Sequence, residues 1–314
     1  MIQSISISGL LTLNLHSLNN EGTEGNMQMT RTVQVVDAKG EVHSVNAISG
    51  DMFKHAQAEY FRAIAVEAGL TLCEASRKGD PNRVNDDPEF KALLEKNQKP
   101  KLPGAYVVDE ILKRCALTDC EGTLVVANGY SVPRKSCIEF GWVGGRPEST
   151  RTDSFLHVKY DPQNRAKSTG EDDNSGQALL HRPASSGQYA VTVHVEFHRV
   201  GRNDISQTTI DEKDRKKRMK ALAESVAYTF VQPRGAQRNT QSPHVGAFAG
   251  VLATSTSSVP APAMSALDAD YKEQITSIKK QLDILSPGKV TLHAFGDMAG
   301  FVEHVTTIAT SFGA

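Results

Sequence analysis

The stretch Ala47-Ile48-Ser49-Gly50-Asp51-Met52-Phe53-Lys54-His55 marks the start of a helix and a candidate phosphate site. Ser49 and Asp51 are residue types that cap helix N-termini. The apolar residues behind them recur at helical spacing, which predicts a helix from about Gly50 to Ala68. Free backbone N–H groups and the positive end of the helix dipole would meet Lys54 and His55 there, a combination that suits a phosphate. The alternative is an ordinary cap followed by a solvated lysine.

Upstream of this helix, a strand-like run from about Ile2 to Leu15 leads into a polar, turn-rich loop from His16 to Gly22. A strand, a polar loop and a Ser-Gly helix start with a basic first turn can together hold a nucleic-acid backbone without reading its bases. The candidate nucleic-acid-binding residues from these two segments are His16, Asn19, Asn20, Ser49, Gly50, Lys54 and His55.

The order of the remaining elements predicts an α+β fold. A hairpin is expected around the turn signal at residues 37–40, followed by short strands near 122–126 and 136–143. A strong strand (189–197), a long helix (211–230) and another strand (244–253) come later. This order is compatible with a βαββαβ ferredoxin-like core that carries large insertions. Residues 254–264 are rich in Ser, Thr, Pro and Ala and predict a flexible linker.

Three segments lie outside that core. Residues 70–119 predict a helical insertion, and residues 265–314 a C-terminal extension of helix, strand and helix. Residues 144–187 mix basic side chains with an acidic run and few apolar residues. A disordered surface loop and an extended hairpin with a polar tip both remain open for that segment.

Composition limits the classes of function. The chain has 314 residues, 39% hydrophobic and 23% charged, with a formal net charge of −1, so any basic surface must be local. No apolar run is long enough to span a membrane and no secretory leader is evident, so we expect a cytoplasmic location. The four cysteines are expected to be reduced thiols, and we predict no metal site and no cofactor.

Further basic segments add candidates for RNA contact. Residues 213–220 form a basic helix, for which a solvated helix face is the alternative. Two basic loops, 133–136 and 234–238, have turn chemistry and could equally be ordinary exposed loops. Because aromatic residues make up only 6% of the chain and do not cluster on a strand, we expect contacts to the RNA backbone rather than base stacking in the ordinary manner. The candidates from the two loops are Arg134, Lys135, Arg234, Gly235 and Arg238, and Lys159 of the segment 144–187 is a further candidate.

Motifs for catalysis are not evident. The chain has no Gly-rich P-loop, no HExxH and no GxSxG motif, and its carboxylates do not define one cluster. We therefore predict a protein without catalytic residues.

The chain resembles the DevR-type backbone subunit of type I CRISPR interference complexes (Cascade), of type I-A/I-B-like kind, within the RAMP superfamily. The resemblance covers most of the length, and its specificity comes from the order of many short pieces. These pieces are Gly9-Leu10-Leu11-Thr12-Leu13-Asn14, Leu18-Asn19-Asn20-Glu21-Gly22, Ile48-Ser49-Gly50, Met52-Phe53-Lys54-His55, Pro133-Arg134-Lys135-Ser136, Phe140-Gly141-Trp142, His157-Val158-Lys159-Tyr160-Asp161-Pro162, Arg199-Val200-Gly201, Asn203-Asp204, Gln232-Pro233-Arg234-Gly235-Ala236 and Pro243-His244.

The resemblance implies one RAMP-type domain over residues 1–314, shaped like a right hand. Its palm would be RRM-like, with 70–119 as a helical insertion and 144–187 as a thumb. It further implies a non-catalytic subunit whose copies assemble head-to-tail along CRISPR guide RNA, with a target DNA strand and other Cascade subunits as partners.

Two other functions stay open. One is a metal-dependent RAMP ribonuclease that uses His16 or His55 with a nearby carboxylate. Cleaving type III relatives place an aspartate in the loop before their helix start, where this chain has Asn26. The other is a DNA-binding autoregulator, although a helix-turn-helix with a basic recognition helix is not evident.

Overall fold

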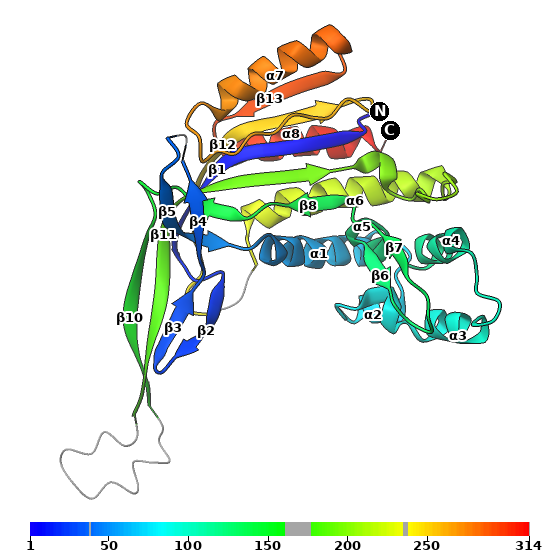
Figure 1. Ribbon diagram of the computed structural model, residues 1–314, viewed down its shortest axis with the longest axis horizontal. Coiled ribbons are helices and arrows are strands. Elements are labelled where there is room, and N and C mark those ends of the chain that lie inside the picture. The colour runs from blue at the N-terminus through cyan, green and yellow to red at the C-terminus, as the bar shows by residue number, and fades with distance from the viewer. Residues whose placement is uncertain (38, 161–176, 235–237, 314) are drawn as a thin grey trace, which may run out of the picture.

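A large, mostly antiparallel sheet forms the centre of the computed structural model, which describes residues 1–37, 39–160, 177–234 and 238–313 (Figure 1). Its strands in chain order are β1 (Ser4–His16), β2 (Asn20–Glu24), β3 (Met27–Thr30), β4 (Thr32–Val36), β5 (Val42–Ile48), β8 (Ile138–Phe140), β9 (Val143–Gly145), β10 (Arg151–Tyr160), β11 (Gln177–Val195), β12 (His244–Ser255) and β13 (Val290–Phe295). The fold is therefore of mixed α/β type, as the pattern of the sequence predicts.

Four strands form the middle of the sheet, in the spatial order β12, β1, β11, β8. Each pair of neighbours is antiparallel. In the register, Ile5 faces Thr254 on one side and Val195 on the other, and Val195 in turn faces Ile138. Segments that lie far apart in the sequence thus make up one continuous surface, because β1 pairs with β11 and β12, which come much later in the chain.

Three helices cover one face of this sheet: α1 (Gly50–Glu67), α6 (Glu212–Val231) and α8 (Met298–Ser311) (Figure 1). Side chains alternate along β1, so its odd-numbered apolar residues, such as Ile5 and Leu11, point into the core below these helices. Stacked aromatic rings hold the layer together, with the Phe230 ring centroid 5.6 Å from Phe53 and 5.0 Å from Phe248. The last turn of α6 therefore packs beside the first turn of α1.

The opposite face of the sheet is covered by the chain between β12 and α7 (Tyr271–Leu285). The Ser6 hydroxyl donates to the Ala261 carbonyl at 2.8 Å, and the Met264 amide donates to the Ser8 hydroxyl at 3.2 Å. Ala266 is fully buried in a second apolar cluster on this side. The prediction of a flexible linker over residues 254–264 is therefore wrong, because the polar face of β1 gives this segment hydrogen-bond partners.

The helical insertion packs against the end of α1 as a separate group of short elements (Figure 1). They are α2 (Glu74–Arg77), a 3-10 turn η1 (Arg83–Asp86), α3 (Pro88–Lys96), α4 (Gly104–Arg114), α5 (Ala116–Glu121) and the two-stranded β6 (Thr123–Val125) and β7 (Val132–Arg134). All residues of α5 are buried, so α5 is the point where this group joins the core.

Two hairpins of the sheet project from the body of the protein (Figure 1). β10 and the first part of β11 pair from Arg151↔Ser186 to Tyr160↔Gln177 and extend away from the body (Figure 1). β2 and β3 form a second hairpin beside it, linked by the pairing of Met27 with His181. No described helix is long and apolar enough to cross a membrane.

Candidate nucleic-acid interface

The helix start and the polar loop predicted from the sequence meet in the structure. Ser49 is the N-cap of α1, and its hydroxyl accepts a hydrogen bond from the Met52 amide at 3.3 Å. The Ser49 amide in turn donates to the Asn19 Oδ1 atom at 2.8 Å. Asn19 thereby fixes the position of the loop relative to the first turn of α1, where the helix leaves its amides without intrahelical partners.

Gly50 begins α1 at a position that has no space for a side chain. A Cβ atom there would lie 2.5 Å from the Phe140 carbonyl oxygen and 3.1 Å from that of Gly141. The helix start therefore rests directly on the connection between β8 and β9. The carbonyl groups of that connection and the loop at Asn19 surround the first turn from two sides.

His16 and Asn20 lie at the two ends of this loop. His16 is 2% exposed, and its ring contacts Tyr189 edge-on with centroids 5.1 Å apart. Burial lowers the pKa of His16 to about 4, so the imidazole is neutral at pH 7. Asn20 exchanges hydrogen bonds with Ser17. The structure thus buries His16 behind the loop, whereas Asn20 is half-buried at the start of β2 and is held there by Ser17.

Lys54 points into the protein from the first turns of α1. Its ammonium donates to the Ser136 hydroxyl at 2.7 Å and to the Ile138 carbonyl at 3.3 Å. Burial lowers the pKa of Lys54, an effect that the nearby Glu121 carboxylate partly opposes. His55 on the next position is exposed. A phosphate contact by Lys54 would need these hydrogen bonds to break, whereas His55 is accessible.

Arg134 lies in the interior, which corrects its assignment as an exposed RNA-binding residue. It is 1% exposed and forms ion pairs with Asp119 at 2.6 Å and Asp204 at 2.8 Å. Its other guanidinium hydrogens go to the carbonyls of Asp119, Arg199 and Arg202. With these donors engaged inside the protein, Arg134 has none left for a nucleic acid.

The neighbouring Lys135 is exposed and forms an ion pair with Glu139 at 3.2 Å. In the loop after α6, the Arg234 guanidinium lies over the Tyr60 ring of α1, 4.3 Å from its centroid. Arg238 donates to the Pro233 carbonyl at 3.3 Å. Lys159 is in β10, and Gly235 lies outside the described residues. The candidates thus divide between a cluster around the α1 start and basic groups elsewhere.

The basic helix turns out to have two different sides. Arg218 is buried and binds Asp119 and Asp214, and Arg215 donates to the carbonyls of Val200 and His198. The lysines face outward around a hollow of about 400 Å³ beside Phe312. Figure 1 shows that this start of α6 is at the opposite end of the sheet from the start of α1.

Two residues of this interface, Trp142 and Arg31, are not among the RNA-binding candidates predicted from the sequence. Trp142 lies in the connection between β8 and β9 and is 54% exposed, and the Arg31 guanidinium lies 5.3 Å from the centroid of its ring. Arg31 also forms an ion pair with Glu21. A lone tryptophan in a Phe-Gly-Trp run could have been singled out as an exposed aromatic, but the approach of Arg31 depends on the hairpin of β2 and β3.

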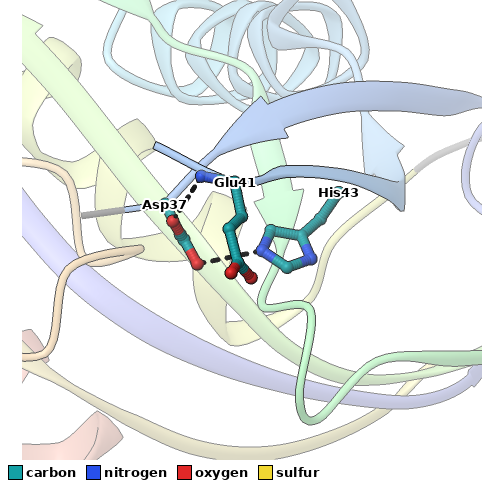
Figure 2. A group of neighbouring side chains, drawn as sticks. All are labelled: Asp37, Glu41 and His43. Carbon is teal, nitrogen blue, oxygen red and sulfur yellow. Dashed lines mark hydrogen bonds and ion pairs between the residues drawn. The ribbon is translucent and has the colours of Figure 1, made fainter. Parts of the chain in front are cut away.

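Within the described residues, one group of side chains has ligand atoms close enough to hold a metal ion: Asp37, Glu41 and His43 (Figure 2). They lie at the tip of the hairpin of β4 and β5. Asp37 accepts hydrogen bonds from the Lys39 and Glu41 amides at 2.9 Å and pairs with His43 Nε2 at 3.0 Å. These bonds account for the arrangement as a tight turn.

Comparisons with known proteins give one consistent result. The family model described as CRISPR-associated negative auto-regulator DevR/Csa2 matches residues 7–276. A relative from Methanocaldococcus jannaschii, CRISPR-associated protein Cas7/Cst2/DevR, is 26% identical over 231 residues, which cover 68% of this chain and 69% of that protein. Two solved chains, from a CRISPR RNA-guided surveillance complex and from such a complex in a pre-nicking state, superpose over 98% of this chain with TM-scores of 0.52 and 0.55. Their identities of 12% and 11% mean that they support the fold alone.

Proposed function

The chain belongs to the DevR/Csa2 family of CRISPR-associated proteins, and on that premise we propose that it is a guide-RNA-binding backbone subunit of a Cascade-like surveillance complex. The relative described above is named a CRISPR-associated protein, and the two solved chains come from CRISPR RNA-guided surveillance complexes. The protein would hold CRISPR RNA by its backbone and leave recognition of sequence to base pairing with a target DNA strand.

We take the central sheet with α1 and α6 as an RRM-like, ferredoxin-like palm. The chain order β1, α1, β8, β11, α6, β12 is the βαββαβ order of that fold. The spatial order β12, β1, β11, β8 with antiparallel neighbours supports this assignment. The remaining parts of the single domain are the helical insertion at 70–119, the thumb at 144–187 and the C-terminal extension at 265–314.

The observation that carries the proposal is the junction between Asn19 and the start of α1. The hydrogen bond from the Ser49 amide to Asn19 brings a polar loop against a helix N-terminus, where unpaired amides and the helix dipole favour an anion. Such a site recognises phosphate and ignores the base, which is what a guide of arbitrary sequence requires.

A head-to-tail assembly gives the β10–β11 hairpin a role. Paired residues share one face of a hairpin, and Leu156, Val158 and Leu179 therefore lie together. Their exposed fractions are 55%, 53% and 46%, which is unusual for three apolar side chains on one projecting element. In this proposal, the hairpin contacts the guide and the next copy of the chain, and other Cascade subunits would bind at the ends of the row.

The same geometry argues against a nuclease that relies on His16. Its imidazole is 2% exposed, packed on Tyr189 and neutral, so a scissile phosphate could not reach it without unfolding of the loop. Arg218 and Arg215, which would have to face outward on a basic recognition helix, point into the protein. These observations favour a non-catalytic RNA-binding role over a ribonuclease that uses His16 and over the DNA-binding autoregulator.

The test is to express the chain with a CRISPR array, purify it at low salt and extract the bound nucleic acid. The proposal predicts RNA of uniform length whose sequences derive from the array. A matched preparation of the chain without the array controls for adventitious cellular RNA. Bound RNA of random length and origin, or none, would count against a guide-binding subunit.

A further inference from the structure

Resting on the proposed function, we infer that the Trp142 indole is a stacking platform for one base of the bound single-stranded RNA, immediately beside the helix start that holds the phosphate. The substrate class is an unpaired nucleobase, and the contact would not distinguish between bases. A planar ring can stack on any base, since every base presents a π-face.

Trp142 is exposed at a place where the backbone is rigid. It is the only tryptophan of the chain, and 54% of it is accessible to solvent. On either side the backbone is fixed, because the Gly141 amide donates to the Thr192 carbonyl at 2.9 Å and Val143 pairs with Ile48 in the sheet. A large aromatic ring held at the surface by an ordered backbone loses little entropy when a planar ligand stacks on it.

A continuous series of contacts joins Trp142 to the proposed phosphate site. The Arg31 guanidinium lies over the indole, and the Arg31 amide donates to the Asn19 carbonyl at 3.2 Å. Asn19 accepts from the Ser49 amide, and Gly50 rests on the carbonyls of the residues that immediately precede Trp142. The ring and the first turn of α1 are therefore parts of one rigid arrangement, close enough to take a base and its phosphate from one short stretch of RNA.

The charges around the ring favour a neutral, flat partner. Arg31 is paired with Glu21, so its positive charge is largely balanced where it meets the indole. The Arg31 guanidinium makes a cation–π contact with the indole, and its central carbon lies 5.3 Å from the ring centroid. A phosphate would gain little electrostatic attraction from Arg31, because Glu21 neutralises its charge. A base, in contrast, can stack on the exposed part of the ring.

The usual stacking surface of an RRM-like sheet is not accessible here. RRM domains stack bases on aromatic residues of the open sheet face. In this chain residues 256–267 cover that face, held by the hydrogen bonds of Ser6 and Ser8. Stacking therefore has to occur at the end of the sheet, which is where Trp142 lies.

Because the chain has a single tryptophan, intrinsic fluorescence excited at the indole band reports on Trp142 alone. The full chain is titrated with a single-stranded oligoribonucleotide, and binding is followed in parallel by the anisotropy of a 5′-labelled copy. The inference predicts a change in tryptophan emission that saturates together with the anisotropy. An oligomer of abasic ribose phosphates should compete for binding without changing the emission.

Three variants complete the test. Trp142→Ala should weaken RNA binding about fivefold to a hundredfold, and Trp142→Phe should restore most of it because the ring is kept. Tyr106→Ala, which removes an exposed aromatic ring from α4, is the matched control and should bind RNA as the wild type does. Normal binding by Trp142→Ala, or RNA saturation without a change in emission, overturns the stacking platform while the proposed function stands. If the wild type binds no RNA, both fail.

Discussion

Gly50→Ala is the substitution for which the structure makes the sharpest prediction. The added methyl group would lie 2.5 Å from one backbone oxygen and 3.1 Å from another, with the Phe140 carbonyl carbon at 3.2 Å. All three are main-chain atoms, so no side chain can turn away, and either α1 or the connection after β8 must move. Overpacking of this kind costs about 1–3 kcal/mol, more than the gain of alanine over glycine near a helix start.

Urea unfolding followed by circular dichroism measures this cost. With a slope of roughly 3 kcal/mol per M, the midpoint should fall by about 0.3–1 M. Gly296→Ala is the matched control, because a Cβ atom at Gly296 meets no atom within 4 Å. Its unfolding free energy should stay within about 0.5 kcal/mol of the wild type.

The same substitution should also weaken RNA binding under conditions in which the variant is fully folded. Displacement of the first turn of α1 moves its amides away from the loop at Asn19, which is held through the Ser49 amide. Anisotropy with labelled RNA, in the absence of urea, measures the loss. A Gly50→Ala protein that matches the wild type in midpoint and in RNA affinity would refute the role assigned to this junction.

Three further predictions concern other parts of the molecule. Arg134→Ala should lower the unfolding free energy measured in urea by about 3–5 kcal/mol, because Asp119 is left buried with one ion-pair partner fewer. Lys135→Ala, at an exposed position, should change it little, and equal stability of the two variants would contradict the buried position of Arg134. Burial lowers the pKa of His16 from 6.5 to about 4, so between these pH values the unfolded chain binds a proton that the folded chain excludes. As the pH falls from 7 to 4, the unfolding free energy of the wild type should therefore fall by about 3 kcal/mol relative to that of His16→Gln, and parallel pH profiles of the two proteins would contradict this. Leu156→Asp on the projecting hairpin should leave the unfolding free energy within about 0.5 kcal/mol, yet prevent ordered assemblies on long RNA in electron micrographs; unchanged assemblies would argue against a contact there.

Local signals in the sequence were sufficient for the long helix that begins at Gly50. The cap at Ser49 and the helical spacing behind it predict α1 to within a residue, and the C-terminal extension is predicted to end in a helix, which is α8 (Met298–Ser311). Asp297 caps that helix through the Gly300 amide. Such elements depend on neighbours within one or two turns, and these neighbours are visible in the sequence.

The features that the sequence did not predict depend on contacts between residues far apart in the chain. A basic loop looks the same whether its arginine faces solvent or an interior aspartate, and Arg134 pairs with Asp204 across 70 positions of the chain. The segment 254–264 has the composition of a linker, but its position depends on Ser6 and Ser8 of the first strand. The contact between Asn19 and Ser49 likewise joins residues 30 positions apart, so the sequence predicts the two pieces of the interface without showing that they meet.

The central claim is that the protein binds the RNA backbone around the start of α1 without reading the bases. The most direct measurement is the affinity of the purified chain for two single-stranded RNAs of unrelated sequence over a series of salt concentrations. The claim predicts similar affinities for both and a logarithmic salt slope of about −2 if three phosphates are contacted. A slope near zero, or a strong preference for one sequence at every salt concentration, would contradict it.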